Sequence, residues 1–291
     1  MSLPAAVRLY TGPSMDQGAL QSAAGLGAGA AGGEWLSLIA PAHNEQENIG
    51  PLVAEVALAF LQLEAMGVRC ELIVVDDGST DGTRAAVLAE ARGRAFVRCV
   101  AMSRTAAGKG NGQSAAFYAG VRASRGSLVA TIDADLQNDP VDLIKMVAKL
   151  RESGADMVQG DRSHARKDNA VRRFTSVVGR FFRGLILSDA VRDTGCSLRV
   201  LKREFAVGLP LQLRGMHRFI PVTVADLGGR VVEMDVSHRP RVAGTTKYGF
   251  GIWQRAIPGL IDCFAVRYMR NRRRSVESVE LPLAGAAGVP G

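Results

Sequence analysis

Short apolar runs alternate with helical segments between residues 35 and 162, and this alternation constrains the fold more than any other feature. The apolar runs predict buried strands at 35–41, from 71 to the turn Asp76-Asp77-Gly78, and at 96–102, 127–135 and 155–162. The segments between them predict helices at 44–67, 83–92, 114–124 and 140–153. Alternating strands and helices form βαβ units, so we expect an α/β fold with a mostly parallel central sheet and right-handed crossovers.

Polar residues gather where three of the predicted strands end. The first strand is followed by His43-Asn44-Glu45, the second ends in Asp76-Asp77, and the fourth carries Asp133 and Asp135. Ligands of parallel α/β sheets bind beyond the carboxyl ends of the strands. Three acidic tips at one edge are what a site for a nucleotide and a metal ion would need.

The stretch TIDADLQNDP, residues 131–140, holds the densest acidic group. On a strand, Asp133 and Asp135 would point to the same face because side chains alternate with period two. Like charges this close repel unless a cation or hydrogen-bond donors hold them, and a divalent cation with oxygen ligands would do so. Gln137 adds a neutral oxygen. The alternative is a solvated turn, with Asp139-Pro140 starting the next helix.

The chain has 291 residues, of which 47% are hydrophobic, and a formal net charge of +8. A basic balance favours an anionic partner such as phosphate groups, nucleic acid or a membrane surface. Nucleic acid is disfavoured because the basic residues form no recognisable motif and the acidic tips would repel phosphate without metal. The cysteines Cys70, Cys99, Cys196 and Cys263 show no metal-binding spacing, so we expect reduced, mostly buried thiols of a cytosolic protein.

Four regions are expected along the chain. Residues 1–33 form a Gly/Ala-rich, disordered leader, 34–249 the main α/β domain, 250–274 amphipathic basic helices, and 275–291 a loose tail. A GxGxxG match at 27–32 is discarded because no strand precedes it. The sequence predicts neither a transmembrane helix nor a signal peptide.

Four motifs, in this order, carry a resemblance: IAPAHNEQENI, VVDDGSTDGT, GKGNGQSAAFYAG and IDADLQNDP. Together they resemble family 2 glycosyltransferases with the GT-A fold, which is Rossmann-like and binds nucleotide-diphosphate sugars. The further motifs GDR, DTGCSLR and HRPRVAGTTKYG are similar to the branch of dolichol-phosphate mannosyltransferases and polyprenyl-phosphate glycosyltransferases. The resemblance covers residues 35–250.

This resemblance implies roles for individual residues. Asp133, Asp135 and Arg239 would be catalytic, Asp76 would read the base edge, and His43 stands where the branch often has Tyr. Arg239 and Lys247 would close over the diphosphate. The implied donor-binding residues are Pro41, His43, Glu45, Val74, Asp76, Asp77, Asp133, Ala134, Asp135, Arg239 and Lys247.

A metal and an acceptor are implied as well. Asp135 and Gln137 would hold Mg²⁺ or Mn²⁺ against the diphosphate. Arg162, Arg172 and Ser176 match positions that bind the phosphate of a polyprenyl lipid.

The implied chemistry does not require a dedicated general base. A lipid phosphate is already anionic near neutral pH, since phosphate monoesters have a second pKa of about 6. Single displacement would invert the anomeric carbon, and no motif supplies the carboxylate nucleophile that a retaining mechanism needs. Any of four histidines could still serve as a base: His43, His164, His217 and His238.

Two basic segments favour a membrane surface. Residues 162–183 interleave arginines with apolar side chains such as Phe174, Phe181 and Phe182. Residues 250–274 end in RNRRR, and Pro258 is expected to split them into two short helices. One side of this segment is apolar: Trp253, Ile257, Leu260, Ile261, Phe264 and Tyr268. The alternatives are a solvated helix face for the first segment and an ordinary packed helix for the second.

We therefore expect a metal-dependent, inverting glycosyltransferase that attaches peripherally to the inner face of the plasma membrane, directly or through a membrane-protein partner. Two alternatives stay open. One is the same enzyme class with a glycan or protein acceptor, and the other is a non-catalytic protein that binds nucleotide sugars. The QxxRW signature of processive synthases is absent.

Overall fold

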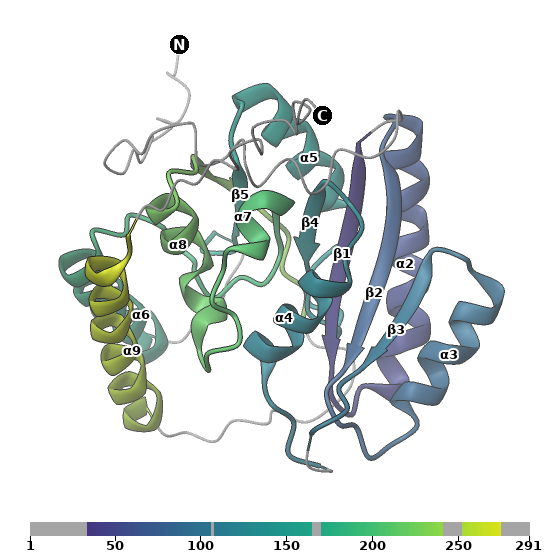
Figure 1. Cartoon of the computed structure of the whole chain (residues 1–291), viewed down its shortest axis with the longest axis horizontal. Helices are drawn as coiled ribbons and strands as arrows, with labels where there is room; N and C mark the ends of the chain where they lie inside the picture. Colours follow the sequence, from purple (N-terminus) through teal and green to yellow (C-terminus); the bar gives the residue numbers. More distant parts are fainter. Residues whose placement is uncertain (1–33, 106–107, 165–169, 241–251, 275–291) are drawn as a thin grey trace, which may run out of the picture.

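The computed structural model describes residues 34–105, 108–164, 170–240 and 252–274 (Figure 1). Within α6 and α9, the side chains described begin at residues 179 and 258. The expected leader, the tail and the segment that contains Lys247 lie outside the described residues.

One seven-stranded sheet runs through the described part of the chain, with strand order β3-β2-β1-β4-β6-β5-β7. All neighbours pair in parallel except β6, which is antiparallel to both β4 and β5. The expected mostly parallel α/β fold is thus confirmed. The strands are β1 (Trp35–Ala42), β2 (Arg69–Asp76), β3 (Val97–Ala101), β4 (Leu128–Thr131), β5 (Met157–Asp161), β6 (Arg199–Lys202) and β7 (Val231–Asp235).

Helices cover both faces of the sheet (Figure 1). One face packs α2 (Gln46–Ala65), α3 (Thr83–Gly93) and α5 (Asp142–Ser153) into a single apolar cluster. The other packs α4, α6, α7, α8, α9 and the short 3₁₀ helix η1 into a second cluster. Their bounds are α4 (Gln113–Ala123), α6 (Ala170–Leu187), α7 (Arg203–Val207), η1 (Met216–Phe219), α8 (Ile220–Asp226) and α9 (Ile252–Arg272).

The alternation of side chains along β1 explains this layering. Leu36 and Leu38 belong to the first cluster and Ile39 to the second, and all three are fully buried. Helix α4 lies so close to β1 that a Cβ on Gly120 would stand 2.3 Å from a side-chain carbon of Ile39. A glycine at this position lets the helix that borders the candidate site pack directly on the strand.

Most predicted elements are present, with three differences. The expected strand 127–135 ends at Thr131, so Asp133 and Asp135 lie in the following loop and the same-face argument was wrong. Strands β6 and β7 were not predicted. The expected break at Pro258 is also wrong, since α9 is continuous from 252 to 272. A proline removes one hydrogen-bond donor, and packing against α6 and the core preserves the helix.

Among the described helices, α2 alone is long and apolar enough to cross a membrane. It packs against β2 and buries Ile49, Leu52, Val53, Val56 and Leu63. In this structure α2 is therefore a core helix.

Candidate active site

A cavity of about 320 Å³ opens at the edge of the sheet toward which the arrows of β1 and β2 point in Figure 1. It falls within the size range of small-molecule sites. Loops after β1, β2 and β4 and the start of α4 form its walls. The lining includes Pro41, His43, Glu45, Asp77, Lys109, Gly110, Gln113, Asp133, Ala134 and Asp135. Seven residues expected to bind the donor therefore meet in one cavity.

Asp77 organises the loop that precedes α4. Its carboxylate accepts the backbone N–H of Asn111 at 2.8 Å and that of Gly112 at 2.7 Å. Its backbone carbonyl accepts a hydrogen bond from His43 Nδ1 at 2.7 Å, so this nitrogen carries a proton. Gly110 passes close by with φ of 60°, and a Cβ there would lie 2.9 Å from Asp77 Oδ2. Asp77 thus joins the tips of β1 and β2 to the loop 108–112.

Asp76 and Val74 lie away from the cavity lining. Val74 is fully buried within β2. Asp76 accepts the Ser79 N–H at 3.0 Å and the Arg84 Nε–H at 2.7 Å. Burial alone would raise the pKa of Asp76, but the hydrogen bonds from Ser79 and the Arg84 guanidinium outweigh it and hold the pKa below its ordinary value. The structure therefore shows Asp77, rather than Asp76, facing the cavity.

The paired acids follow β4 on a tight turn. Leu136 adopts φ of 61°, a conformation that bulky residues avoid, and its buried side chain anchors the turn in the core. This turn lets the Gln137 N–H donate to Asp135 Oδ1 at 3.2 Å. Gln113 Nε2 donates to Asp133 Oδ1 at 2.6 Å. The two carboxylates are thus presented by a buried loop rather than by a strand face.

Asp133 lies near both negatively and positively charged groups. Burial and next the Asp135 carboxylate raise its pKa, while the Ser197 hydroxyl and the guanidinium groups of Arg162 and Arg199 act in the opposite direction. Arg199 is almost completely buried, and burial lowers its pKa to about 10. Its Nη1 donates to the His217 carbonyl at 2.8 Å.

Arg162 lies at the end of β5 and contacts Asp193 through two hydrogen bonds, from Nε at 2.9 Å and from Nη2 at 3.3 Å. Both side chains are more than nine-tenths buried. Its charge also acts on Asp133, so one expected acceptor residue lies close to an expected donor residue. Arg172 and Ser176 fall in the part of α6 whose side chains are not described.

Arg239 lies outside the cavity lining. Its guanidinium pairs with Glu55 at 2.9 Å and with Asp139 at 2.5 Å, and its backbone N–H donates to the Gln137 carbonyl at 2.8 Å. Lys109 instead contributes a cation to the cavity lining. The sequence analysis quoted Lys109 within GKGNG without assigning it a role, and it also gave no role to Gln113.

Comparison with known proteins decides the family. The model of glycosyl transferase family 2 matches residues 37–207, more than half of the chain. The chain belongs to glycosyltransferase family 2. This confirms the resemblance noted from the motifs and establishes the protein as a glycosyltransferase.

Two curated relatives and one solved structure are similar to this glycosyltransferase. It is 36% identical over 255 residues to the dodecaprenyl-phosphate galacturonate synthase of Rhizobium johnstonii, covering 87% of this chain and 73% of the relative. It is 32% identical over 218 residues to the undecaprenyl-phosphate 4-deoxy-4-formamido-L-arabinose transferase of Shewanella sediminis, covering 75% and 62%. Glucosyl-3-phosphoglycerate synthase of Mycobacterium tuberculosis, solved with Mn²⁺ and UDP, superposes with a TM-score of 0.59 at 20% identity, covering 87% and 86%. The structural likeness confirms the GT-A fold.

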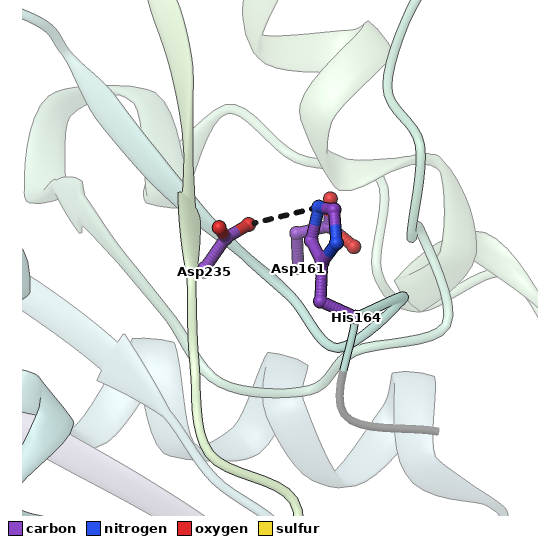
Figure 2. A group of neighbouring side chains, drawn as sticks. All are labelled: Asp161, His164 and Asp235. Atoms are coloured by element: carbon purple, nitrogen blue, oxygen red, sulfur yellow. Dashed lines mark ion pairs between the residues drawn. The ribbon is translucent and has the colours of Figure 1, made fainter. Parts of the chain in front are cut away.

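A second group of side chains in this glycosyltransferase has metal-ligand geometry. Figure 2 shows Asp161 and Asp235, from the ends of β5 and β7, facing His164. Their ligand atoms lie within 4.8 Å of one another, and His164 Nε2 is 3.8 Å from Asp235 Oδ1. Arg192 Nε lies 3.0 Å from Asp161 Oδ2 and so already compensates this buried carboxylate. A divalent cation would have to compete with that guanidinium.

The four cysteines of the glycosyltransferase are free thiols, and Cys70, Cys196 and Cys263 are buried. Burial raises the pKa of Cys196 to about 11, so the thiol stays protonated beside Arg162 and Asp193. These observations agree with the reduced, mostly buried thiols expected from the sequence.

Proposed function

We propose that this glycosyltransferase moves a sugar from a nucleotide-diphosphate sugar, such as GDP-mannose or a UDP-sugar, to polyprenyl phosphate. The observation that carries the proposal is the cavity lined by Asp133 and Asp135, together with the charge of Arg162, which acts on Asp133. The names of the two curated relatives, both polyprenyl-phosphate sugar transferases, support the same acceptor class. The cavity would take the donor, and Arg162 would attract the acceptor phosphate toward Asp133.

The paired acids fit a divalent cation. Asp135 lines the cavity, and Gln137 follows it on the same turn. Their carboxylate and amide oxygens are the hard ligands that Mg²⁺ and Mn²⁺ prefer. Bound there, Mg²⁺ or Mn²⁺ would offset the repulsion within the pair and neutralise charge on the leaving diphosphate. Asp133, held by Gln113, would face the donor sugar or ribose.

Cations of the chain itself would stabilise the leaving group. Lys109 lines the cavity, and Arg239 and Lys247 are the further candidates carried over from the family resemblance. Arg239 would first have to leave Glu55 and Asp139. Donors and cations aimed at developing charge are a principal source of catalysis. The acceptor phosphate, bound by Arg162, Arg172 and Ser176, would attack the anomeric carbon directly and invert it.

Membrane attachment is the second part of the proposal. Helices α6 and α9 lie side by side (Figure 1). Their described side chains leave large apolar groups in solvent. We call this the α6–α9 ridge, and it consists of Phe181, Phe182, Leu185, Ile261, Phe264 and Tyr268. Such an exposed apolar surface on a monomer marks an interaction site.

The charge around the ridge favours an anionic lipid surface. Helix α6 has no acidic residue and α9 has only Asp262, whereas both are rich in arginine. Two copies of such a basic face would repel each other, whereas each cation near anionic lipid contributes about 1 kcal/mol. We therefore propose peripheral attachment through the α6–α9 ridge, at the cytoplasmic face of the plasma membrane where nucleotide sugars are available.

The acceptor is tested with a panel of radiolabelled GDP- and UDP-sugars, undecaprenyl phosphate, and Mg²⁺ or Mn²⁺. Label in the organic extract with one donor is the expected result. Transfer only to water-soluble glycans or proteins would overturn the lipid acceptor. Donor binding without transfer or hydrolysis would indicate a non-catalytic protein.

The ridge is tested by flotation with vesicles that contain phosphatidylglycerol. Replacement of Phe181 and Phe264 by Ser should reduce the vesicle-bound fraction several-fold. A matched control is replacement of Leu58 and Leu61, which α2 exposes to a similar degree on a different helix. Equal vesicle binding by both variants would contradict membrane attachment through the α6–α9 ridge. Self-association that is lost only in the ridge variant would indicate that a second copy of the chain covers the ridge.

A further inference from the structure

Hydrogen bonds from two adjacent residues of α4 connect Asp133 to His217, which lies 84 residues further along the chain. Gln113 and Ser114 are the first two residues of α4. Gln113 contacts Asp133, while Ser114 Oγ lies 2.8 Å from the ring nitrogen Nδ1 of His217. Gln113 and Ser114 are adjacent in the first turn of α4, and they therefore hold the loop after β4 and the helix η1 in place.

The Ser114 hydroxyl contacts both the backbone N–H and the ring of His217. The backbone N–H of His217 donates to Ser114 Oγ at 3.0 Å, which leaves the hydroxyl proton of Ser114 for Nδ1. A hydroxyl has one proton to donate. Oγ also keeps a second lone pair, so the tautomer with Nδ1 as the acceptor and the ring proton on Nε2 is part of the proposal below and is tested there.

His217 is fixed from other directions as well. Met216 and Phe219 on either side of it are buried in the second core cluster. Arg199 donates to the His217 carbonyl, and the charge of Arg199 also acts on Asp133. Burial, with Arg218 and Arg199 next, lowers the pKa of His217 to about 3, so the ring stays neutral at the pH of the cytoplasm.

We propose that His217 is a positioning residue for sugar transfer: it fixes Ser114 and the first turn of α4, so that Gln113 holds Asp133 toward the donor. This role rests on the proposed donor contact of Asp133. A carboxylate that is free to rotate would meet the repulsion of Asp135 by turning away from the cavity. Misplacement of a catalytic group by about 1 Å can cost 100-fold in rate.

The tautomer is tested first, because it does not depend on a substrate. The chain has 4 histidines, so long-range ¹H–¹⁵N spectra of protein labelled at histidine resolve each ring. The signals that disappear in His217→Asn should report a neutral ring protonated on Nε2 at pH 7. A ring protonated on Nδ1, or on both nitrogens, would overturn the proposal.

The role is tested with two variants that each mimic one ring nitrogen. Asn places its amide near the Nδ1 position and can accept from Ser114, whereas Gln places its amide near Nε2. Both variants are assayed with undecaprenyl phosphate and with whichever donor reacts among UDP-glucose, UDP-galacturonate and GDP-mannose. The kcat of His217→Gln should be about tenfold below that of His217→Asn. The donor KM should agree within about twofold, because other residues would bind the nucleotide.

Other outcomes contradict the proposal. If His217→Gln is the more active variant, Nε2 contacts a substrate and His217 is a binding residue. If both variants lose activity equally, in proportion to a fall in thermal midpoint, His217 only supports the fold. Ser114→Ala should match His217→Gln, and the double variant should be no worse. Failure of all three donors would contradict the proposed function, while the spectra would still decide the tautomer.

Discussion

Arg162 and Asp193 form a buried ion pair in which Nε lies 2.9 Å from one carboxylate oxygen and Nη2 lies 3.3 Å from the other. Asp193 also accepts the Gly195 N–H at 3.1 Å and the Arg162 N–H at 3.2 Å. The pair therefore fixes the guanidinium whose charge acts on Asp133, and it closes the turn that precedes β6. An acceptor phosphate would meet an arginine that is already oriented.

Removal of Asp193 should destabilise the protein strongly. Asp193→Ala leaves Arg162 buried without its counter-charge, and breaking a buried ion pair costs about 3–5 kcal/mol. Urea unfolding followed by circular dichroism measures the loss. Glu152→Ala is the control, because the Lys149–Glu152 pair is solvent-exposed and should contribute less than about 1 kcal/mol. Equal effects of both changes would contradict the importance of the buried pair.

Asp135→Asn should weaken metal binding at the cavity. Electron paramagnetic resonance of Mn²⁺ in the presence of UDP or GDP should show at least tenfold weaker binding, because the charged ligand of the proposed site is lost and only the amide of Gln137 remains. Asp235→Asn, in the second group of potential ligands, should leave binding unchanged. The opposite pattern would place the ion at Asp161, His164 and Asp235.

Gly110→Ala should disturb the donor site. The residue has φ of 60°, and the new Cβ would meet Asp77 Oδ2 at 2.9 Å, so the loop 108–112 must shift. The left-handed conformation alone costs about 1–2 kcal/mol for a residue with a Cβ. Calorimetry with UDP or GDP should show an affinity reduced several-fold. Gly93→Ala is the control, since nothing lies within 4 Å of its Cβ position, and unchanged affinity in both variants would contradict a donor role for the loop.

Stability should depend on pH through His217. Its pKa is about 3 in the folded protein and about 6.5 in an unfolded chain, so between these values only the unfolded state binds the proton. The free energy of unfolding therefore falls as the pH falls from about 6.5 toward 3, and the full contribution is present above 6.5. Between pH 7 and pH 5, His217→Asn should lose less stability than the parent protein, by an amount on the order of 1 kcal/mol.

Urea midpoints at pH 5, 6 and 7 check this expectation. His164→Asn, at a side chain that is 67% exposed, is the control for the general effect of replacing a histidine by asparagine. Identical pH dependence in the parent and in His217→Asn would contradict the lowered pKa.

The first half of the fold could be predicted because each strand there is a continuous apolar run followed by polar residues. Part of the cavity lining was also accessible from motifs, since His43 and Asp77 directly follow strands and Asp133 comes two residues after β4. Strand β6 was not recognised because it is short and contains Arg199. That arginine is buried only because the carbonyls of Cys196 and His217 accept its hydrogen bonds, a tertiary arrangement that periodicity does not reveal.

The position of Asp133 and Asp135 in a loop could not be predicted from the hydrophobic pattern alone, for a related reason. The run 127–135 is apolar enough for a strand, but Leu136 in the left-handed region turns the chain into a loop. Gln113 and His217 were missed as partners because they approach Asp133 and Ser114 through packing of α4 against η1.

The reversed direction of β6 has a consequence for how this enzyme can change over evolution. Since β6 runs opposite to its neighbours, its entry segment 193–198 lies at the same edge as the loops after β4 and β5. Thr131 donates to the Ser197 carbonyl, Asn138 donates to Ser197 Oγ at 3.0 Å, and Asp193 holds Arg162. A single six-residue stretch therefore contacts both the loop proposed to hold the donor and the arginine proposed to bind the acceptor, so mutations within it would alter both selectivities together.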